Sequence, residues 1–156
     1  MLDRGVARHM SPLELESYRG VVNYLPHLAV QNPKSSSTPV CIVFDASRAQ
    51  GGGPGLNKIL AKGPDRFLNN LAEVIIRFRN GVFAVKGDVK KMYNCVELER
   101  EDCFVQCFLW RGLDSSQEPM TYQVVVNNIG VKPAGCIATL ALYKSSDRFS
   151  KVCPAT

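Results

Sequence analysis

The sequence lacks any long hydrophobic run. Its apolar stretches extend over only a few residues, whereas a membrane-spanning helix needs roughly 18 to 20. The N-terminal stretch MLDRGVARHM contains no apolar core of the kind found in signal peptides, so we expect no such peptide there. These two absences argue against a membrane protein and a secreted protein. They predict an intracellular chain, in the cytoplasm or the nucleus, with no membrane partner.

Several catalytic and metal-binding patterns are missing as well. The six cysteines form no CxxC pair and only two histidines are present, so a zinc site of the Cys/His type is not expected. The sequence has no GxSxG elbow of a serine hydrolase and no GxxxxGK[ST] phosphate loop. In a reducing compartment, the cysteines are predicted to be small core residues.

The chain has the amino-acid composition of an ordinary globular domain. Of the 156 residues, 46% are hydrophobic and 21% are charged, which allows a buried core and argues against wholesale disorder. Nineteen basic and fourteen acidic residues give a net charge of +5. This mild basic excess is compatible with a phosphate-rich partner such as a nucleic acid, but does not identify one.

The hydrophobic pattern predicts an α+β fold, because strands and helices are interleaved without a regular βαβ order. Short apolar runs predict four strands, at 41–47, 82–89, 104–110 and 121–127, and the first of them is also rich in β-branched residues. The last two runs are separated by a polar turn and are expected to form a hairpin. Asp45, which follows the apolar part of the first run, is interpreted as a turn or packing residue.

Two helices are predicted from apolar residues that recur at helical spacing. The first has a favourable start at Pro64-Asp65 and a stop at Asn80-Gly81. Its apolar stripe consists of Leu68, Leu71, Ala72, Ile75 and Ile76. The second helix is expected over 133–148, opened by a proline. Near the N-terminus, Ser11 and Glu14 have the spacing of a capping box for a short helix.

A glycine-rich run, RAQGGGPGLNK, occupies residues 48–58. It lacks the glycine order of phosphate-binding loops, and no helix is expected to begin directly on it. A flexible loop is therefore favoured over a phosphate cradle.

Asp88 has the position that best suits metal chemistry. It ends the predicted strand at 82–89, follows a glycine, and precedes two lysines and an aromatic residue. A carboxylate at the end of a buried strand can hold Mg²⁺, which commonly takes one or two carboxylates together with substrate phosphates. From spacing alone, the simpler interpretation, an aspartate that turns the chain after the strand, is favoured.

Several longer motifs, taken in order, favour the metal-binding interpretation of Asp88 over the simpler one. They are YLPHLAV, SSSTPVCIVFDAS, GPGLNKIL, GPDRFLNNLAEVIIRFRNGVFAVKGDVKKMYNCVEL, FLW and NNIGVKPAGCIATLAL. This series resembles the reverse transcriptase of LTR retrotransposons, most closely the BEL/Pao group, over about residues 20 to 150. The resemblance implies an incomplete right-hand polymerase fold. Residues 1–23 would be a polar, partly helical segment, 24–81 a fingers-like region and 82–156 a partial palm.

The resemblance also implies roles for individual residues. Asp88 matches the metal-binding aspartate of the first palm motif, and the carbonyl of Val89 would also face the metals. Tyr93 matches the steric gate that excludes a ribose 2′-hydroxyl. The nucleotide and the template would lie near Lys132, Pro133 and Ala134. The family reaction is RNA-directed DNA synthesis, a nucleotidyl transfer by two Mg²⁺ ions that uses a template-primer and dNTPs.

Two departures from the family pattern affect activity. Cys41 stands where the family has an arginine that grips the incoming triphosphate, and a thiol cannot supply that bidentate positive fork. No Asp-Asp pair is present, so the YxDD hairpin, with its metal-binding aspartates, is missing. One carboxylate cannot hold two Mg²⁺ ions against their hydration. We therefore expect the chain to be inactive alone and to lack part of the polymerase.

Three interpretations follow from these residues. The chain is a fragment of a retrotransposon polymerase, a domesticated module that binds nucleic acid without catalysis, or an unrelated α+β domain. The second would need a basic face with aromatic residues for stacking on bases. The candidates for that face are Arg77, Arg79, Lys86, Lys90 and Lys91, together with Tyr93. The alternative for these residues is an ordinary solvated surface.

Overall fold

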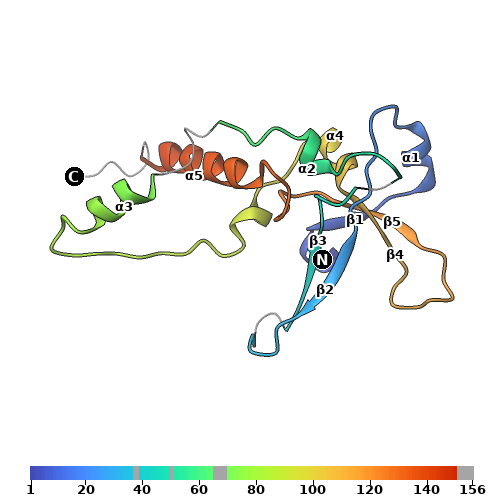
Figure 1. Ribbon diagram of the computed structural model, residues 1–156, viewed down its shortest axis with the longest axis horizontal. Helices are drawn as coiled ribbons and strands as arrows, with labels where there is room; N and C mark the ends of the chain where they lie inside the picture. The colour runs from blue at the N-terminus through green and yellow to red at the C-terminus, as the bar shows by residue number, and fades with distance from the viewer. Residues whose placement is uncertain (37–38, 50, 65–69, 151–156) are drawn as a thin grey trace.

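The computed structural model describes residues 1–36, 39–49, 51–64 and 70–150. Within these ranges the chain forms a small α+β fold with two antiparallel sheets, which agrees with the predicted class. Figure 1 shows both sheets at one end of an elongated molecule, while α5 (Ala134–Ser150) and α3 (Leu71–Phe78) extend toward the other. None of the described helices is long and apolar enough to span a membrane.

The first sheet has three strands in the order β1-β5-β4. Their bounds are β1 (Ala7–His9), β4 (Cys107–Trp110) and β5 (Met120–Val124). β4 and β5 pair antiparallel with Phe108 opposite Tyr122, which confirms the predicted hairpin. The predicted strand at 104–110 begins too early, because Phe104–Gln106 form the 3-10 helix η4, which follows the short helix α4 (Arg100–Cys103). β1 has only three residues, too few to show an alternating pattern.

The second sheet is a hairpin of β2 (His27–Gln31) and β3 (Val40–Phe44). β3 lies within one residue of the predicted start at 41 but ends before Asp45. The Asp45 carboxylate accepts hydrogen bonds from the backbone N–H groups of Ser47 (3.0 Å) and Arg48 (3.2 Å), so this aspartate is the predicted turn residue. β2 was not predicted, because Pro26 obscures the strand pattern that follows it.

The main core lies where the two sheets meet. The ring of Phe108 contacts those of Phe44 and Tyr122, with centroid distances of 5.2 and 5.6 Å, and His27 lies 5.5 Å away. Since Phe44 belongs to β3 and Phe108 to β4, these rings join the two sheets. A smaller cluster, containing Met10, Phe104 and Cys107, lies beneath α1 (Pro12–Ser17).

The cysteines divide between the core and the surface. Cys103 and Cys107 are buried as predicted, and burial raises the pKa of the Cys107 thiol to about 11. The prediction is wrong for Cys41 and Cys95, which are exposed on β3 and on η3 (Met92–Cys95). The first four residues of β3 are all exposed, so the hairpin has no covering layer at Cys41. Cys136 is half-buried, and the sixth cysteine lies outside the described residues.

The predicted capping box opens α1. The Ser11 hydroxyl accepts the Glu14 backbone N–H (3.2 Å), while the Glu14 carboxylate accepts the Ser11 backbone N–H (3.1 Å). Glu14 also pairs with Arg8 at 2.8 Å. The Ser11 backbone hydrogen bond, followed by the Arg8 side chain, lowers the pKa of Glu14 from 4.5 to about 2.

The Glu14 contacts make stability depend on pH in the acid range. Because the pKa of Glu14 is lower in the folded chain, its contribution is fully present above pH 4.5 and disappears as the pH falls toward about 2. A Glu14→Gln variant should therefore melt below the wild type near neutral pH, and the two melting temperatures should converge across this window. Thermal scans of both chains from neutral to acid pH measure the difference. A gap that stays constant down to pH 2 would contradict this assignment.

Residues 82–89, predicted as a buried strand, form no strand and are exposed throughout. Val82, Phe83 and Val85 are 94%, 91% and 90% exposed, respectively. Their β-branched and aromatic side chains favour an extended backbone, but a strand forms only when another strand pairs with it. No described strand lies beside this segment, and it runs extended across the lower left of Figure 1.

The helix before this segment forms where the pattern indicates. Asn70 caps α3, its side-chain oxygen accepting the Ala72 backbone N–H at 3.0 Å. The helix ends at Phe78, two residues before the predicted stop. Its apolar stripe does not reach the core: Leu71 and Ile76 are 71% and 63% exposed, respectively. The predicted start at Asp65 and Leu68 lies outside the described residues. We call residues 70–91, which comprise α3 and the extended segment, the arm.

Candidate functional site

Three of the predicted site residues lie where the first sheet connects to α5: Lys132 and Pro133 end the connecting loop, and Ala134 begins the helix. Asn57, on the short helix α2 (Leu56–Ile59), holds this loop with its side chain. The amide nitrogen of Asn57 donates to the Gly130 carbonyl (2.8 Å), and its amide oxygen accepts the Lys132 backbone N–H (2.7 Å). The same nitrogen donates to the Ser47 hydroxyl (3.0 Å). One half-buried side chain therefore connects three segments.

The local sequence explains why the loop takes this course. Gly130 has a φ of 98°, a backbone conformation that residues with a Cβ rarely adopt. A Cβ there would also lie 3.1 Å from the Phe44 carbonyl oxygen. At the other end of the loop, the buried Asn127 side chain donates to the Ala134 carbonyl (2.9 Å). The loop is thus held on both sides by side-chain amides.

Tyr93 lies against the same region, although it is far away in the sequence. It is half-buried on η3, and a Cβ added at Gly135 would lie 3.9 Å from its hydroxyl oxygen. The phenol therefore covers the first turn of α5, next to Pro133 and Ala134. Tyr93 therefore lies near the start of α5, which follows Lys132 and Pro133 in the sequence. Ala134 is 2% exposed, so only Pro133 and the exposed Lys132 offer side-chain surface.

Asp88 and Val89 lie on the exposed arm. The position of Asp88 at the end of a buried strand was predicted wrongly, for the reason given for residues 82–89. The Val89 carbonyl accepts the Met92 backbone N–H at 3.2 Å, which closes the turn into η3. Within the described ranges, no three His, Cys, Asp or Glu side chains gather as a metal site would require. Asp88 alone does not fit a site for two Mg²⁺ ions.

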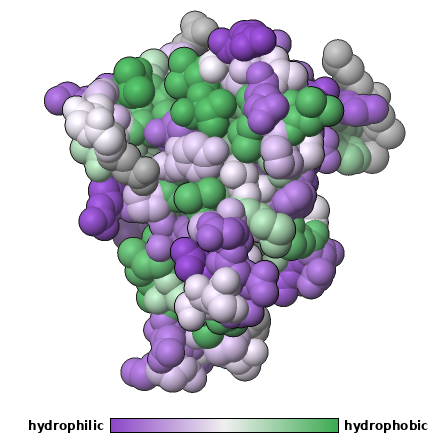
Figure 2. Space-filling view, turned by 90° about the vertical axis from the view of Figure 1, so that its right-hand side faces the viewer, coloured by the Kyte–Doolittle hydropathy of each residue, from purple (hydrophilic) through white to green (hydrophobic). Residues whose placement is uncertain are grey.

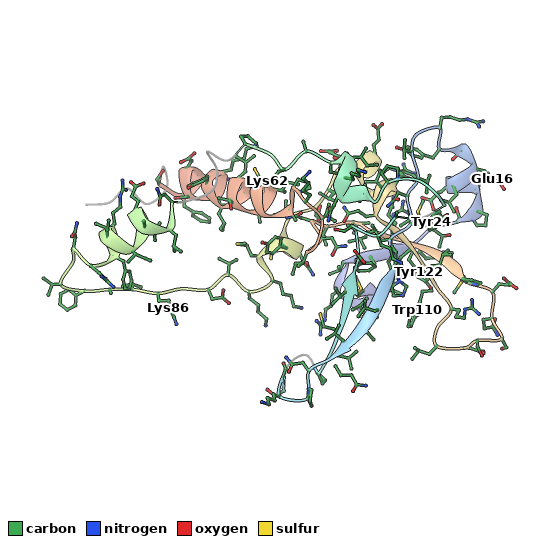
Figure 3. All side chains as sticks on the ribbon, in the orientation of Figure 1. Glu16, Tyr24, Lys62, Lys86, Trp110 and Tyr122 are labelled. Carbon is green, nitrogen blue, oxygen red and sulfur yellow. The ribbon has the colours of Figure 1, made fainter. Side chains whose placement is uncertain are left out.

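The predicted basic face is spread along the arm. All five of its cations are exposed: Arg77, Arg79, Lys86, Lys90 and Lys91. Arg77 forms an ion pair with Glu73 one turn earlier on α3, which reduces its availability to a phosphate. Figure 3 shows Lys86 on the extended segment, on the side away from α5. These cations are distributed in the sequence from α3 to the residue before η3.

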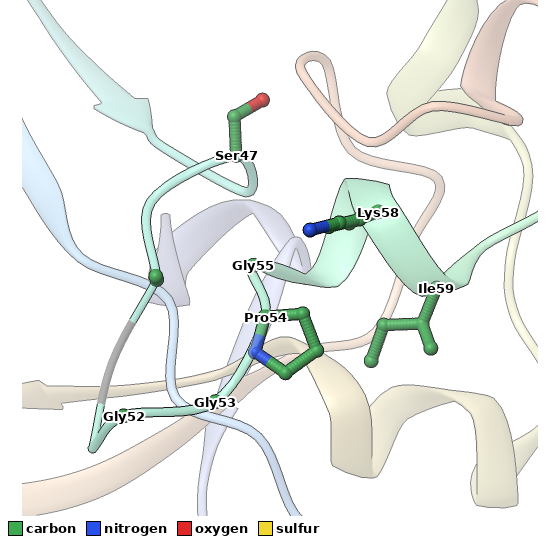
Figure 4. A pocket seen from close by; sticks show the side chains of 8 residues that line it. Ser47, Gly52, Gly53, Pro54, Gly55, Lys58 and Ile59 are labelled. Atoms are coloured by element: carbon green, nitrogen blue, oxygen red, sulfur yellow. The ribbon is translucent and has the colours of Figure 1, made fainter.

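A hollow of about 600 Å³ lies beside the glycine-rich loop. Figure 4 shows Ser47 and Lys58 on two sides of it, with glycine backbone between them. α2 begins directly after Gly55, so the expectation that no helix begins on this run is wrong. Gly55 is required there because a Cβ would collide with the Ser47 carbonyl. This close approach places Asn57 beside the loop at 130–132.

Sequence reasoning missed Asn57. The only available signal was an amide residue beside glycines and prolines in GPGLNK, a pattern equally typical of a turn. Its two partners on the loop lie more than seventy positions away, and hydrogen bonds over that separation leave no periodicity in the sequence. Comparison of the chain with protein-family models gives no match, and comparison with curated proteins gives none either.

Proposed function

We propose that this chain is a fragment of an RNA-directed DNA polymerase, similar to those of BEL/Pao LTR retrotransposons, comprising the fingers and the first part of the palm. The observation that carries the proposal is the meeting of two distant motifs. Tyr93 of GDVKKMY lies over the first turn of α5, which follows NNIGVKP. A polymerase must bring a sugar-sensing aromatic ring and a nucleotide-binding loop to one place.

The exposed arm provides a second line of support. A fragment that lacks part of its palm should have an apolar strand without a neighbour. Residues 82–89 have that character: three of their apolar side chains are at least 90% exposed and their backbone is extended. An ordinary complete domain seldom leaves such a segment in water, because burying each large apolar side chain contributes about 1.5–3 kcal/mol.

In this function, most of the described residues would bind the nucleic acid and select the incoming nucleotide, and would not take part in bond formation. The Tyr93 ring would occupy the space of a ribose 2′-hydroxyl, and Lys132 would approach a phosphate of the nucleotide or the template. The arm cations would contact the nucleic-acid backbone without reading its sequence. Asp88 would contribute one carboxylate to a metal site completed by other residues. Cys41, exposed on β3, supplies no positive charge to a triphosphate.

The second candidate is a nucleic-acid-binding module without catalysis. The net charge of +5 and the exposed cations on the arm favour it. This module would use the same surfaces, so binding alone does not separate the two functions. What separates them is whether a reading frame that supplies YxDD belongs to the same protein.

Sequencing the transcript through codon 156 and beyond tests the proposal. We expect the frame to continue into a YxDD motif within about 30 codons, a distance set by ordinary hairpin and loop lengths. The protein encoded by the whole frame should then extend a DNA primer on an RNA template with Mg²⁺ and dNTPs. Asp88→Asn should abolish this extension, whereas Asp45→Asn, which alters a turn aspartate, should preserve it.

The 156-residue chain by itself should incorporate no nucleotide in the same assay. Template-dependent incorporation by the pure short chain, lost in Asp88→Asn, would contradict this expectation. A stop codon directly after residue 156 would exclude an active polymerase and leave the binding module. Extension by the whole frame that survives Asp88→Asn would overturn the role given to that carboxylate.

A further inference from the structure

We infer that Asn57 is a positioning residue that sets the loop at 130–134 for contact with nucleic acid, an inference that rests on the proposed function. Two of its hydrogen bonds go to the loop backbone, one as donor and one as acceptor, at 2.8 and 2.7 Å. Because donor and acceptor sit on one planar amide, Gly130 and Lys132 are fixed relative to each other as well as to α2.

Asn57 is itself anchored firmly enough to serve as a support. Its backbone N–H donates to the Ala46 carbonyl at 2.9 Å, which connects α2 to the turn after β3. Leu56, the residue before it, is 4% exposed and belongs to the main core. These contacts therefore fix the position of the loop relative to the core where the two sheets meet, while the side chain of Lys132 stays exposed.

Without this support the loop would have more freedom in its first half. The Ala134 carbonyl keeps its bond from Asn127, and Ala134 N–H donates to the Val131 carbonyl at 2.9 Å. The Val131 backbone N–H also donates to the Asn128 carbonyl at 3.3 Å. These backbone bonds form within residues 127–134, so they shape the loop but do not tie it to α2, as the two Asn57 bonds do. Loss of the Asn57 amide should thus release Lys132 selectively, without unfolding α5 or the first sheet.

The experiment measures binding of a labelled RNA–DNA template-primer duplex to the purified chain by fluorescence anisotropy at fixed salt. Asn57→Ala should weaken binding about tenfold, because the two hydrogen bonds to the loop backbone no longer order it. Asn23→Ala is the matched control: it removes another half-buried amide, bonded to the Val105 carbonyl at 3.1 Å, away from the site. Its binding should equal that of the wild type.

A second control tests the third hydrogen bond of Asn57. Ser47→Ala removes the hydroxyl at 3.0 Å but leaves both bonds to the loop, so binding should be unchanged. Hydrogen exchange at the Lys132 amide gives a readout that needs no ligand. We expect exchange about five- to tenfold faster in Asn57→Ala than in Ser47→Ala or the wild type, because the acceptor of that N–H is gone.

A double-mutant cycle separates positioning from general stability. In the wild type, Lys132→Ala should weaken duplex binding about fivefold; in Asn57→Ala, the same change should matter less than about twofold, because an unpositioned lysine contributes little. Equal effects of Lys132→Ala in both backgrounds would overturn the inference. So would binding by Asn57→Ala that equals that of Asn23→Ala. A wild-type chain that does not bind the duplex would overturn the proposed function instead, and the inference with it.

Discussion

Replacing Phe108 by alanine is expected to remove a large share of the free energy of unfolding of the chain. The Phe108 ring contacts Phe44 and Tyr122 and is 6% exposed. Truncating a buried phenylalanine to alanine costs about 3–5 kcal/mol, through lost burial and the cavity left behind. The free energy of unfolding of natural domains is only about 5–15 kcal/mol in total. Because this ring also joins the two sheets, the change removes the contact on which both sheets depend.

Urea unfolding followed by circular dichroism measures this loss. Phe108→Leu is the control, because it keeps an apolar side chain at the junction and should cost less than about 1.5 kcal/mol if the site repacks. A second comparison is Leu13→Ala, at a position 74% exposed on α1, which should change stability by less than about 0.5 kcal/mol. If Phe108→Ala unfolds with the midpoint of the wild type, the two sheets do not share a core.

The parts of the fold predicted from the sequence are those fixed by local pattern. The β4–β5 hairpin forms because a polar turn joins two short apolar runs, and its register places Phe108 opposite Tyr122. The Ser11–Glu14 box and the Pro133 start of α5 follow from chemistry within one helical turn. In each case the residues that decide the structure are close together in the sequence.

The errors arise where a distant partner decides the outcome. Residues 82–89 have the composition of a buried strand, but composition does not supply a neighbouring strand. Cys41 is a small apolar residue suited to a core, yet its hairpin has no covering layer on that side. The Asn57 hydrogen bonds depend on how α2 packs against the loop after Asn127, and the spacing of residues in the sequence does not predict that packing. The assignment of Tyr93 and Lys132 to one site came from the family resemblance, not from local pattern.

The second prediction with a large expected effect concerns the exposed apolar residues of the arm. These residues include Val82, Phe83 and Val85, each at least 90% exposed, which together with Ala84 form one apolar stretch. On the face of the sheet end shown in Figure 2, hydrophobic residues instead form separate patches among hydrophilic ones. A contiguous apolar stretch with an unpaired backbone is a template for association, whereas scattered apolar residues are ordinary surface.

We therefore expect the isolated chain to self-associate through the arm. The triple change Val82→Ser, Phe83→Ser, Val85→Ser should raise the concentration at which light scattering begins at least tenfold, because association would bury side chains worth about 1.5–3 kcal/mol each. The same triple variant should keep the urea midpoint of the wild type, since these side chains are at least 90% exposed in the monomer.

A matched triple variant shows whether contiguity or mere exposure causes the association. Leu2, Leu13 and Leu113 are 49%, 74% and 88% exposed but lie in separate parts of the chain, and changing all three to serine should leave the scattering threshold nearly unchanged. If both triple variants raise the scattering threshold equally, the total exposed apolar surface causes the association, and contiguity does not. A lower urea midpoint in the arm triple would mean that the arm packs on the folded chain. If only the arm triple stays dispersed, residues 82–89 are a surface that needs a partner, as a palm strand without its neighbours would be.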